Sequence, residues 1–419
     1  MTDTEPRTAP PTPTPTRQPM WRLALWLTAE PVSLIGDQIF FLAMAWTAVQ
    51  TGGPKGVGLV LVAGAIPRAL LMLVGGAVVD RLGPRRIAVS SDILRALLMI
   101  VAVTALASHN SIALLMALAA VFGAIDALFY PATGSLAPRV VPATQLVRVQ
   151  NIRALGTRAA LLAGAPLGGL LLTIGGTSLA FTVNVAAFTL SAGALALLKV
   201  RTDQSDQPDR EGMIRQIIDG LRYALTEPVT RNLLLLVALL EFAVNGVINT
   251  AFPSLAADRG WGAQGLGWLV AAFGAGAATA ALVLITAPRI NRPGLLIPGA
   301  ALTGAIVMAL FAGADNRLLV LALSFGIGVV GGVVGGIVIP LIQTTTPPDL
   351  LGRLMSLFGI ATIGTAPLSI AAAALITDQA GLRTAFLYAS ALTLIGALAC
   401  AASSSVRRLQ IQHPAGRSS

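Results

Sequence analysis

The 419-residue chain is 55% hydrophobic and only 11% charged, and it carries a net charge of +10 with a mean hydropathy of +0.80. A soluble domain has about a quarter of its residues charged, so this composition excludes a soluble fold and indicates a membrane protein. One cysteine, Cys400, excludes an intrachain disulfide. With only two histidines besides, we expect no metal site.

The chain opens with a polar segment that alternates Thr and Pro at 11–16. We expect residues 1–20 to form a disordered tail, because they have too few apolar side chains to offset the entropy of ordering. The apolar stretch that follows is longer than the core of a signal peptide and contains Glu30 and Asp37. We therefore expect it to be retained as a first membrane helix.

Twelve apolar segments then recur, and each is long enough to cross about 30 Å of hydrocarbon at about 1.5 Å per residue. The expected spans are 22–50, 57–79, 87–107, 111–137, 154–174, 179–198, 232–256, 264–287, 294–313, 317–342, 354–377 and 382–402. We expect an all-α polytopic membrane protein with twelve transmembrane helices in two six-helix pseudo-repeats. Its expected parts are a tail at 1–20, bundles at 21–198 and 232–402, a cytoplasmic linker at 199–231 and a C-terminal tail at 403–419.

The basic residues are distributed unequally between the loops. Both tails and the loops on the same side hold 22 of the 28 Lys and Arg residues. The opposite loops hold Lys55, Arg259, Arg317 and Arg383. Because cytoplasmic loops of membrane proteins are enriched in positive charge, we expect both termini to be cytoplasmic in a cell membrane, and we expect no nucleic-acid partner.

The two halves share a short pattern. Pro142 precedes Arg148 by six residues before the fifth span, and Pro347 precedes Arg353 by the same interval before the eleventh. With the six-plus-six span count, this indicates duplicated halves. Transporters built this way place their site at the repeat interface, near the middle of the membrane.

The loop after the second span has a specific pattern of glycines and charges. It consists of Gly76, Asp80, Arg81, Gly83, Arg85 and Arg86. All six positions resemble the cytoplasmic signature of the major facilitator superfamily, which implies the fold of that family and a conformational latch in this loop. The corresponding segment 288–293 lacks the first Gly and the Asp, so the expected latch is one-sided.

The fifth span contains Gly164, Pro166, Gly168 and Gly169. This pattern resembles the antiporter signature of the same superfamily, with its proline displaced by one position. A kink that serves only helix packing is an equal alternative.

Other short stretches are similar to the branch of the superfamily that contains macrolide efflux proteins and the enterobactin exporter. They are Gly36-Asp37, Asp92 to Arg95, Tyr130 to Ala132, and Gly352-Arg353. The resemblance implies a small-molecule exporter and leaves the substrate open.

A dinucleotide-type glycine pattern at 326–331 lies inside an unbroken apolar run. We instead expect Gly328, Gly332 and Gly336, each four residues apart, to form a helix-packing face. The chain also has no phosphate-binding loop of the Gly-x-x-x-x-Gly-Lys type. We therefore expect no bound cofactor, and transport that draws on an ion gradient, with a proton gradient as the first choice, or runs downhill.

Several charged residues fall inside the spans. They are Glu30, Asp37, Arg68, Asp92, Arg95, Asp126 and Glu241. A charge at the centre of a spanning helix costs about 2.5 to 3.5 kcal/mol, so these side chains must be paired, protonated or hydrated. A carboxyl group that alternates between wet and dry surroundings can take up and release a proton.

The spacing of these charges separates their expected roles. Asp92 and Arg95, three residues apart, are expected to form a buried ion pair. Asp37 and Asp126 have no base three or four residues away on their own helix, which favours a functional role. For Glu30 and Glu241, structural and functional roles stay open.

The leading hypothesis is a proton-driven exporter of a lipophilic small molecule. Asp37 is the first choice for the proton site, and Glu30, Asp126 and Glu241 are alternatives. Arg68 is expected to control the charge of Asp126. Siderophore export, metabolite uptake or facilitated diffusion, and a non-transporting receptor are the rivals. We expect a monomer with no enzymatic activity, whose partners are its substrate, protons and the lipid bilayer.

Overall fold

A computed structural model describes residues 19–108, 110–200, 222–286, 292–346 and 348–408. Nearly all of the predicted N-terminal tail, most of the predicted linker and the last eleven residues lie outside this part of the chain. The long helices on either side of the predicted linker end at Leu197 and begin at Pro228.

The N-terminal half consists of long helices joined by short turns. They are α1 (Met20–Leu82), α2 (Pro84–Ser108), α3 (Ile112–Gly134), α4 (Ala137–Val140) and α5 (Ala143–Leu197). Both α1 and α5 contain a reversal at a glycine pair, Gly52-Gly53 and Gly175-Gly176. Gly53 and Gly176 have φ of 61° and 64°, which favours glycine. Each of these helices therefore contains two spans.

The C-terminal half has the same plan with two π-helical segments added. Its elements are α7 (Pro228–Gly246), η1 (Val247–Ala251), α8 (Phe252–Asp258), α9 (Gly262–Thr286), α10 (Pro293–Phe311), α11 (Arg317–Thr345), α12 (Pro348–Gly359), η2 (Ile360–Gly364), α13 (Ala366–Ala402) and α14 (Ser404–Arg407). The reversal in α13 is at Gly381, with φ of 83°. The segment η1 interrupts the seventh span, and η2 interrupts the eleventh.

These elements account for twelve spans. Within the described residues, nine continuous helical stretches are long and apolar enough to cross a membrane. Three of the nine, 20–72, 148–197 and 357–402, contain one of the glycine reversals and so cross twice. The predicted all-α fold with twelve transmembrane helices in two six-helix repeats is confirmed.

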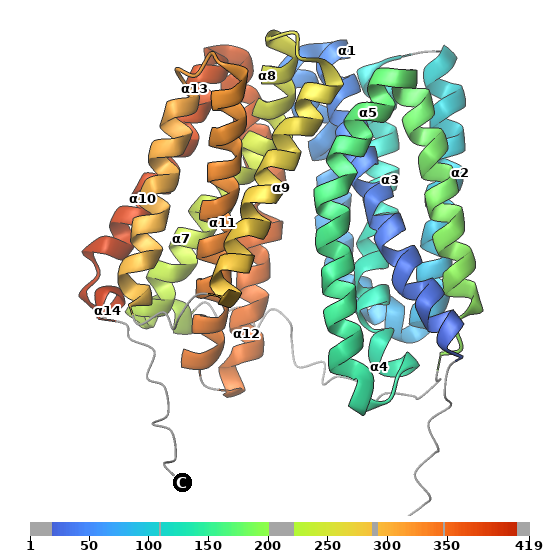
Figure 1. Ribbon diagram of the computed structural model, residues 1–419, viewed down its shortest axis with the longest axis horizontal. Coiled ribbons are helices and arrows are strands. Elements are labelled where there is room, and N and C mark those ends of the chain that lie inside the picture. The colour runs from blue at the N-terminus through green and yellow to red at the C-terminus, as the bar shows by residue number, and fades with distance from the viewer. Residues whose placement is uncertain (1–18, 109, 201–221, 287–291, 347, 409–419) are drawn as a thin grey trace, which may run out of the picture.

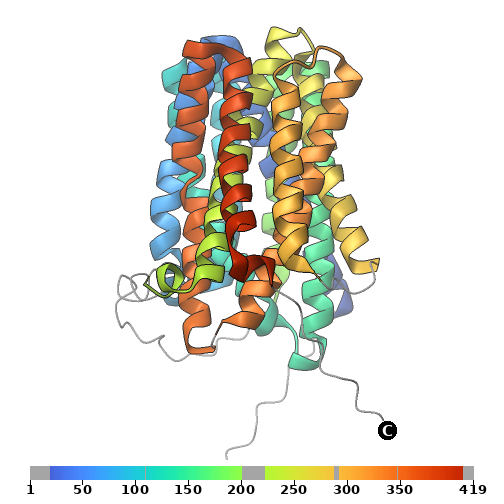
Figure 2. The same cartoon turned by 90° about the vertical axis from the view of Figure 1, so that its left-hand side faces the viewer.

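The helices form two bundles that lie side by side, one from the N-terminal half and one from the C-terminal half (Figure 1). The start of α1 and the short helix α14 lie at the same end of the molecule. The perpendicular view shows the same arrangement (Figure 2). We call this end the terminal side and the opposite end the far side. The terminal-side elements α4, α7 and α12 pack against elements of their own bundle.

The bundles meet through α5 with α9 and through α1 with α13. These contacts use small residues close to the far-side turns. A methyl group on Gly58 would overlap Ala374 of the other bundle, and one on Gly169 would lie 2.8 Å from the Ala263 carbonyl oxygen. The ribbons diverge toward the terminal side (Figure 1). The bundles are therefore closely apposed on the far side.

The predicted glycine face of α11 packs against α9. A methyl group on Gly328 would overlap the Phe273 carbonyl oxygen, and one on Gly332 would lie 2.8 Å from the Ala277 carbonyl oxygen. By contrast, no described atom lies within 4 Å of the position that a methyl group would take on Gly331. The packing role predicted from the four-residue spacing is confirmed.

This contrast gives a matched test within one helix. We expect Gly328→Ala to destabilise the protein by about 1–3 kcal/mol, because the added methyl group separates two closely packed backbones. Gly331→Ala, three residues away, should leave the stability unchanged. Thermal unfolding in detergent would measure both, and equal melting temperatures for the two variants would contradict the packing role.

Candidate functional site

A single guanidinium group holds three carboxylates inside the N-terminal bundle. Arg95 on α2 is fully buried, and its Nη1 lies 2.7 Å from Asp37 Oδ1 on α1. Its Nη2 lies 2.7 Å from Asp92 Oδ1 on the same helix, and Nη1 lies 3.5 Å from Asp126 Oδ1 on α3. The cluster therefore joins three spans through one side chain.

Aromatic rings and small polar groups surround the cluster. The Arg95 guanidinium carbon is 3.9 Å from the centre of the Phe129 ring and 4.8 Å from that of Phe188, distances at which the ring faces attract a cation. Ser33 donates a hydrogen bond to Asp92 Oδ1 at 3.1 Å. Gly36 permits this packing, since a methyl group there would lie 3.1 Å from Phe188.

Arg68 connects the cluster to the protein surface. Its Nε lies 3.1 Å from Asp126 Oδ2, an ion pair whose geometry does not make a hydrogen bond. The Arg68 side chain is 27% exposed, whereas that of Asp126 is fully buried. The guanidinium lies between the rings of Phe41 and Tyr130, at 5.6 and 5.2 Å from their centres.

The charges in this cluster do not balance. Three carboxylates, Asp37, Asp92 and Asp126, face two guanidinium groups, so the fully ionised cluster has a net charge of −1. The outer oxygens, Oδ2, of Asp37 and Asp92 are buried and have no hydrogen-bond partner among the described residues. An unbalanced buried charge is costly, and one added proton would neutralise it. The arrangement is chemically suited to holding one proton.

Glu30 lies apart from this cluster and has its own partner. Arg153 on α5 forms a two-pronged pair with it, with Nε 2.8 Å from Oε2 and Nη2 on Oε1. Arg153 also donates to Gln150 and lies 5.3 Å from the centre of the Trp26 ring. Arg153 is not among the predicted site residues, because the fifth span was expected to begin at 154, which leaves Arg153 in the preceding loop. In the structure α5 already begins at Ala143, which is the correction.

Glu241 lies in the other bundle and is half-buried on α7. Asn245 donates to its backbone oxygen at 2.9 Å and to Oε2 at 3.4 Å, and Asn249 donates in turn to the Asn245 backbone oxygen. Within the described chain, no basic side chain lies within 4 Å of its carboxylate. The four acids predicted as proton sites thus lie in three separate environments. Asp37 and Asp126 share the Arg95 cluster, Glu30 pairs with Arg153, and Glu241 lies beside Asn245.

The predicted latch loop lies at the terminal side. Arg85 donates to the backbone oxygens of Leu195, at 3.2 Å, and Ala196, so it binds the C-terminal end of α5. The side chains of Arg81 and Arg86 are exposed. Gly83, with φ of 90°, ends α1. The surroundings of Gly76 and the side chain of Asp80 lie outside what the structure describes.

The glycines of the fifth span lie at two helix contacts. A methyl group on Gly164 would lie 2.5 Å from Gln38 Cβ on α1, and one on Gly168 would lie 3.1 Å from Leu42 on the same helix. Gly169 instead faces α9 of the other bundle. The non-helical backbone in α5 is at its glycine pair, not at Pro166. These glycines therefore allow α5 to pack closely against α1 of its own bundle and α9 of the other.

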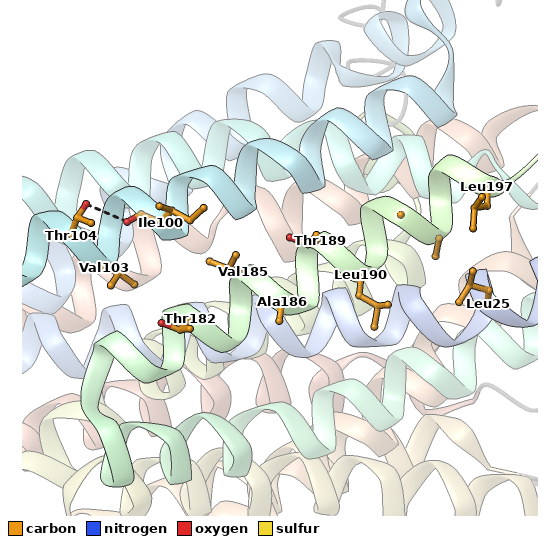
Figure 3. Close-up of a pocket in the computed structure, with 12 residues that line it drawn as sticks. Leu25, Ile100, Val103, Thr104, Thr182, Val185, Ala186, Thr189, Leu190 and Leu197 are labelled. Carbon is orange, nitrogen blue, oxygen red and sulfur yellow. Dashed lines mark hydrogen bonds between the residues drawn. The ribbon is translucent and has the colours of Figure 1, made fainter.

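An apolar cavity lies outside the charged site. It has a volume of about 1030 Å³ and is lined by apolar and threonine side chains of α1, α2 and the second span of α5 (Figure 3). Its exposed wall residues, such as Leu190, lie on the outer surface of the N-terminal bundle.

Twelve spans in two bundles, with charges buried in one of them, define a multi-pass membrane protein of the transporter class. The chain belongs to the Major Facilitator Superfamily, whose sequence profile matches residues 31–364 and again 234–417.

Several known proteins are similar to the chain. The multidrug efflux pump Tap of Mycolicibacterium fortuitum is 29% identical over 90% of this chain and 94% of its own length. The enterobactin exporter EntS of Shigella dysenteriae is 28% identical over 53% of this chain and 52% of its own length. Among solved structures, a mutant of the nucleoside transporter NupG superposes with a TM-score of 0.70 at 12% identity, over 91% of this chain and 99% of that one. This last likeness concerns the fold alone.

The charge balance of the cluster can be tested with a double-mutant cycle. Arg68→Gln would leave a net charge of −2, so we expect a loss of about 3 kcal/mol in stability, at the lower end for a buried pair because Arg68 is partly exposed. Adding Asp126→Asn restores the original net charge and should recover most of the loss. Thermal unfolding of the two single variants and the double variant in detergent would measure the coupling.

Asp315→Asn provides the control for this cycle. Asp315 pairs with Arg259 at 2.9 Å, but its side chain is 91% exposed. We expect this variant to change the stability by less than about 1 kcal/mol. Additive losses for Arg68→Gln and Asp126→Asn would show that the two side chains are not coupled.

Proposed function

We propose that the protein is a proton-coupled exporter of a lipophilic small molecule. The buried cluster with a net charge of −1 supports this most directly, because it has one carboxylate more than its guanidinium groups can neutralise. Asp37 is the preferred proton site. Its Oδ2 is buried without a hydrogen-bond partner among the described residues, and its Oδ1 accepts only from Arg95, whereas Oδ1 of Asp92 accepts from both Arg95 and Ser33. The proton gradient supplies the energy, and no other cofactor takes part.

Helix α1 links the proposed proton site to the contact between the two bundles. This helix carries Asp37 in its first span and, after the turn, Gly58 at the contact with α13 of the other bundle. A change of charge at Asp37 alters the attraction that holds the first span to α2. The same helix must shift for the far-side contacts to open, so proton binding would bias the two arrangements of the bundles.

The direction of transport is proposed from two observations. The relatives Tap and EntS are an efflux pump and an exporter. The bundles are close on the far side and diverge toward the terminal side, which positive-inside charge predicts to be cytoplasmic. A substrate would then enter from the cytoplasm, and both termini would be cytoplasmic in the cell membrane.

A lipophilic substrate fits the side chains beside Arg68. Phe41 is half-buried and Tyr130 is exposed, so both rings are accessible from the surface that Arg68 reaches. Trp26 and Phe40, two other aromatic residues of the first span, are fully buried in the bundle core. They are therefore not available to contact a substrate.

The remaining hypotheses concern substrate and direction. The likeness to EntS keeps siderophore export as an alternative, and metabolite uptake or facilitated diffusion and a non-transporting receptor are less favoured. We propose that the protein acts as a monomer, because one chain supplies both bundles, and that it has neither catalytic residues nor a nucleic-acid partner.

Asp37→Asn tests the proton site. The amide removes one negative charge, so the cluster becomes neutral without a proton and proton uptake should no longer accompany transport. In energised inside-out vesicles, substrate-triggered proton release should fall at least about tenfold, the effect of losing a positioned charge worth about 1.4 kcal/mol. Suitable substrates are lipophilic cations, neutral macrolides and a siderophore.

Asp258→Asn is the matched control, since Asp258 is an exposed carboxylate at the end of α8. It should retain full proton release. Normal proton release and efflux by Asp37→Asn would reject Asp37 as the proton site. If labelled substrate crossed without proton movement in the unmodified protein, proton coupling itself would be wrong.

A further inference from the structure

The groove on the outer surface of the N-terminal bundle runs along the second span of α5. Its lining extends on this helix from Thr182 to Leu197, about 22 Å at 1.5 Å per residue. One wall comes from α2 and the end nearest the terminal side from Leu25 of α1 (Figure 3). The groove is therefore longer than half of a hydrocarbon core of about 30 Å.

The groove faces outward from the bundle. Ile100 and Leu190 in its walls are 49% and 53% exposed. The opposite faces of the same two helices carry the buried side chains of Arg95 and Asn184. An extended polypeptide segment in the groove would have unpaired backbone groups at membrane depth, whereas a hydrocarbon chain has none.

Helical spacing places a cationic side chain next to the terminal-side end of the groove. Arg22 is not itself a lining residue, but it lies one turn before the lining residue Leu25 on α1, and residues three apart are neighbours on a helix. Its guanidinium carbon lies 5.0 Å from the centre of the Trp21 ring, and its Nε is buried without a hydrogen-bond partner in the described structure. No described carboxylate lies within 4 Å of it. Arg and Trp side chains are typical of the headgroup level of a bilayer.

We propose that this groove is a binding site for an anionic phospholipid, with an acyl chain along α5 and the phosphate at Arg22. Hydrocarbon gains little by moving from the bilayer into an apolar groove, because lipid tails are equally apolar. Shape therefore retains the acyl chain, and the charge of Arg22 selects the headgroup. One basic side chain near a membrane surface favours an anionic lipid by about fivefold.

Gly193 keeps the groove open. It is exposed within the lining, and no described atom lies within 4 Å of the position that a Cβ would take there. A leucine at this position would extend into the groove without a clash in the bundle. Gly299 on α10 of the other bundle is also exposed and has no atom within 4 Å, so it offers a matched control.

The test uses the full-length protein in nanodiscs that contain equal amounts of phosphatidylglycerol and phosphatidylcholine. After detergent extraction, native mass spectrometry counts the retained lipid. We expect retained phosphatidylglycerol in the unmodified protein and in Gly299→Leu, and at least a fivefold loss in Gly193→Leu. Equal melting temperatures of the two leucine variants would show that both are folded.

Arg22→Gln tests the contribution of the headgroup to binding separately from that of the acyl chain. It should retain lipid in the groove but lose the preference for phosphatidylglycerol, whereas Arg86→Gln, at an exposed arginine of the same side, should keep it. Equal lipid retention by Gly193→Leu and Gly299→Leu would overturn the site. If the protein retained a transported drug in place of lipid, and only Gly193→Leu abolished this retention, the groove would bind the drug and the assignment of a lipid would be wrong.

Discussion

The pairing of Arg95 with three carboxylates is the interaction on which the N-terminal bundle depends. It joins α1, α2 and α3 in a region where water is excluded, so each charge is stable only while its partners stay in place. Removing one member of such a buried group typically costs about 3–5 kcal/mol. The close approach of Phe188 at Gly36 and the position of Phe129 follow from the need to enclose this one guanidinium.

The cluster and the contact between the bundles are parts of one continuous element. Helix α1 supplies Asp37 to the cluster and, after its glycine turn, Gly58 to the far-side contact with α13. Likewise, α5 supplies Arg153 for Glu30 and Gly169 for the contact with α9. The contacts between the bundles are made mainly by α1 and α5, and both helices also carry side chains of buried ion pairs. The ion pairs inside the N-terminal bundle and its packing against the other bundle are therefore physically linked.

Local patterns in the sequence predicted local structure well. Hydropathy gave the twelve spans, and the four-residue spacing of Gly328 and Gly332 gave the packing face of α11. The pair Asp92–Arg95 follows from helical geometry alone. The partners Asp37 and Arg95 are 58 residues apart, and Glu30 and Arg153 are 123 apart. Such pairs depend on how helices rotate against each other, which one helix's periodicity does not encode. Hydropathy also misplaced the start of α5, because its first turns are polar.

The two halves differ in the charges that they bury. The interval of 205 residues that relates Pro142 to Pro347 places Phe358 where the first half has Arg153. Among the described residues, Glu241 has only an amide side chain, Asn245, as a hydrogen-bond partner, whereas Glu30 has a guanidinium. The C-terminal bundle instead interrupts its seventh and eleventh spans with η1 and η2, a feature that often marks functional positions. Ion pairs fix the spacing of three spans in the N-terminal bundle, whereas π-helical turns interrupt the regular backbone hydrogen bonding of two spans in the C-terminal bundle.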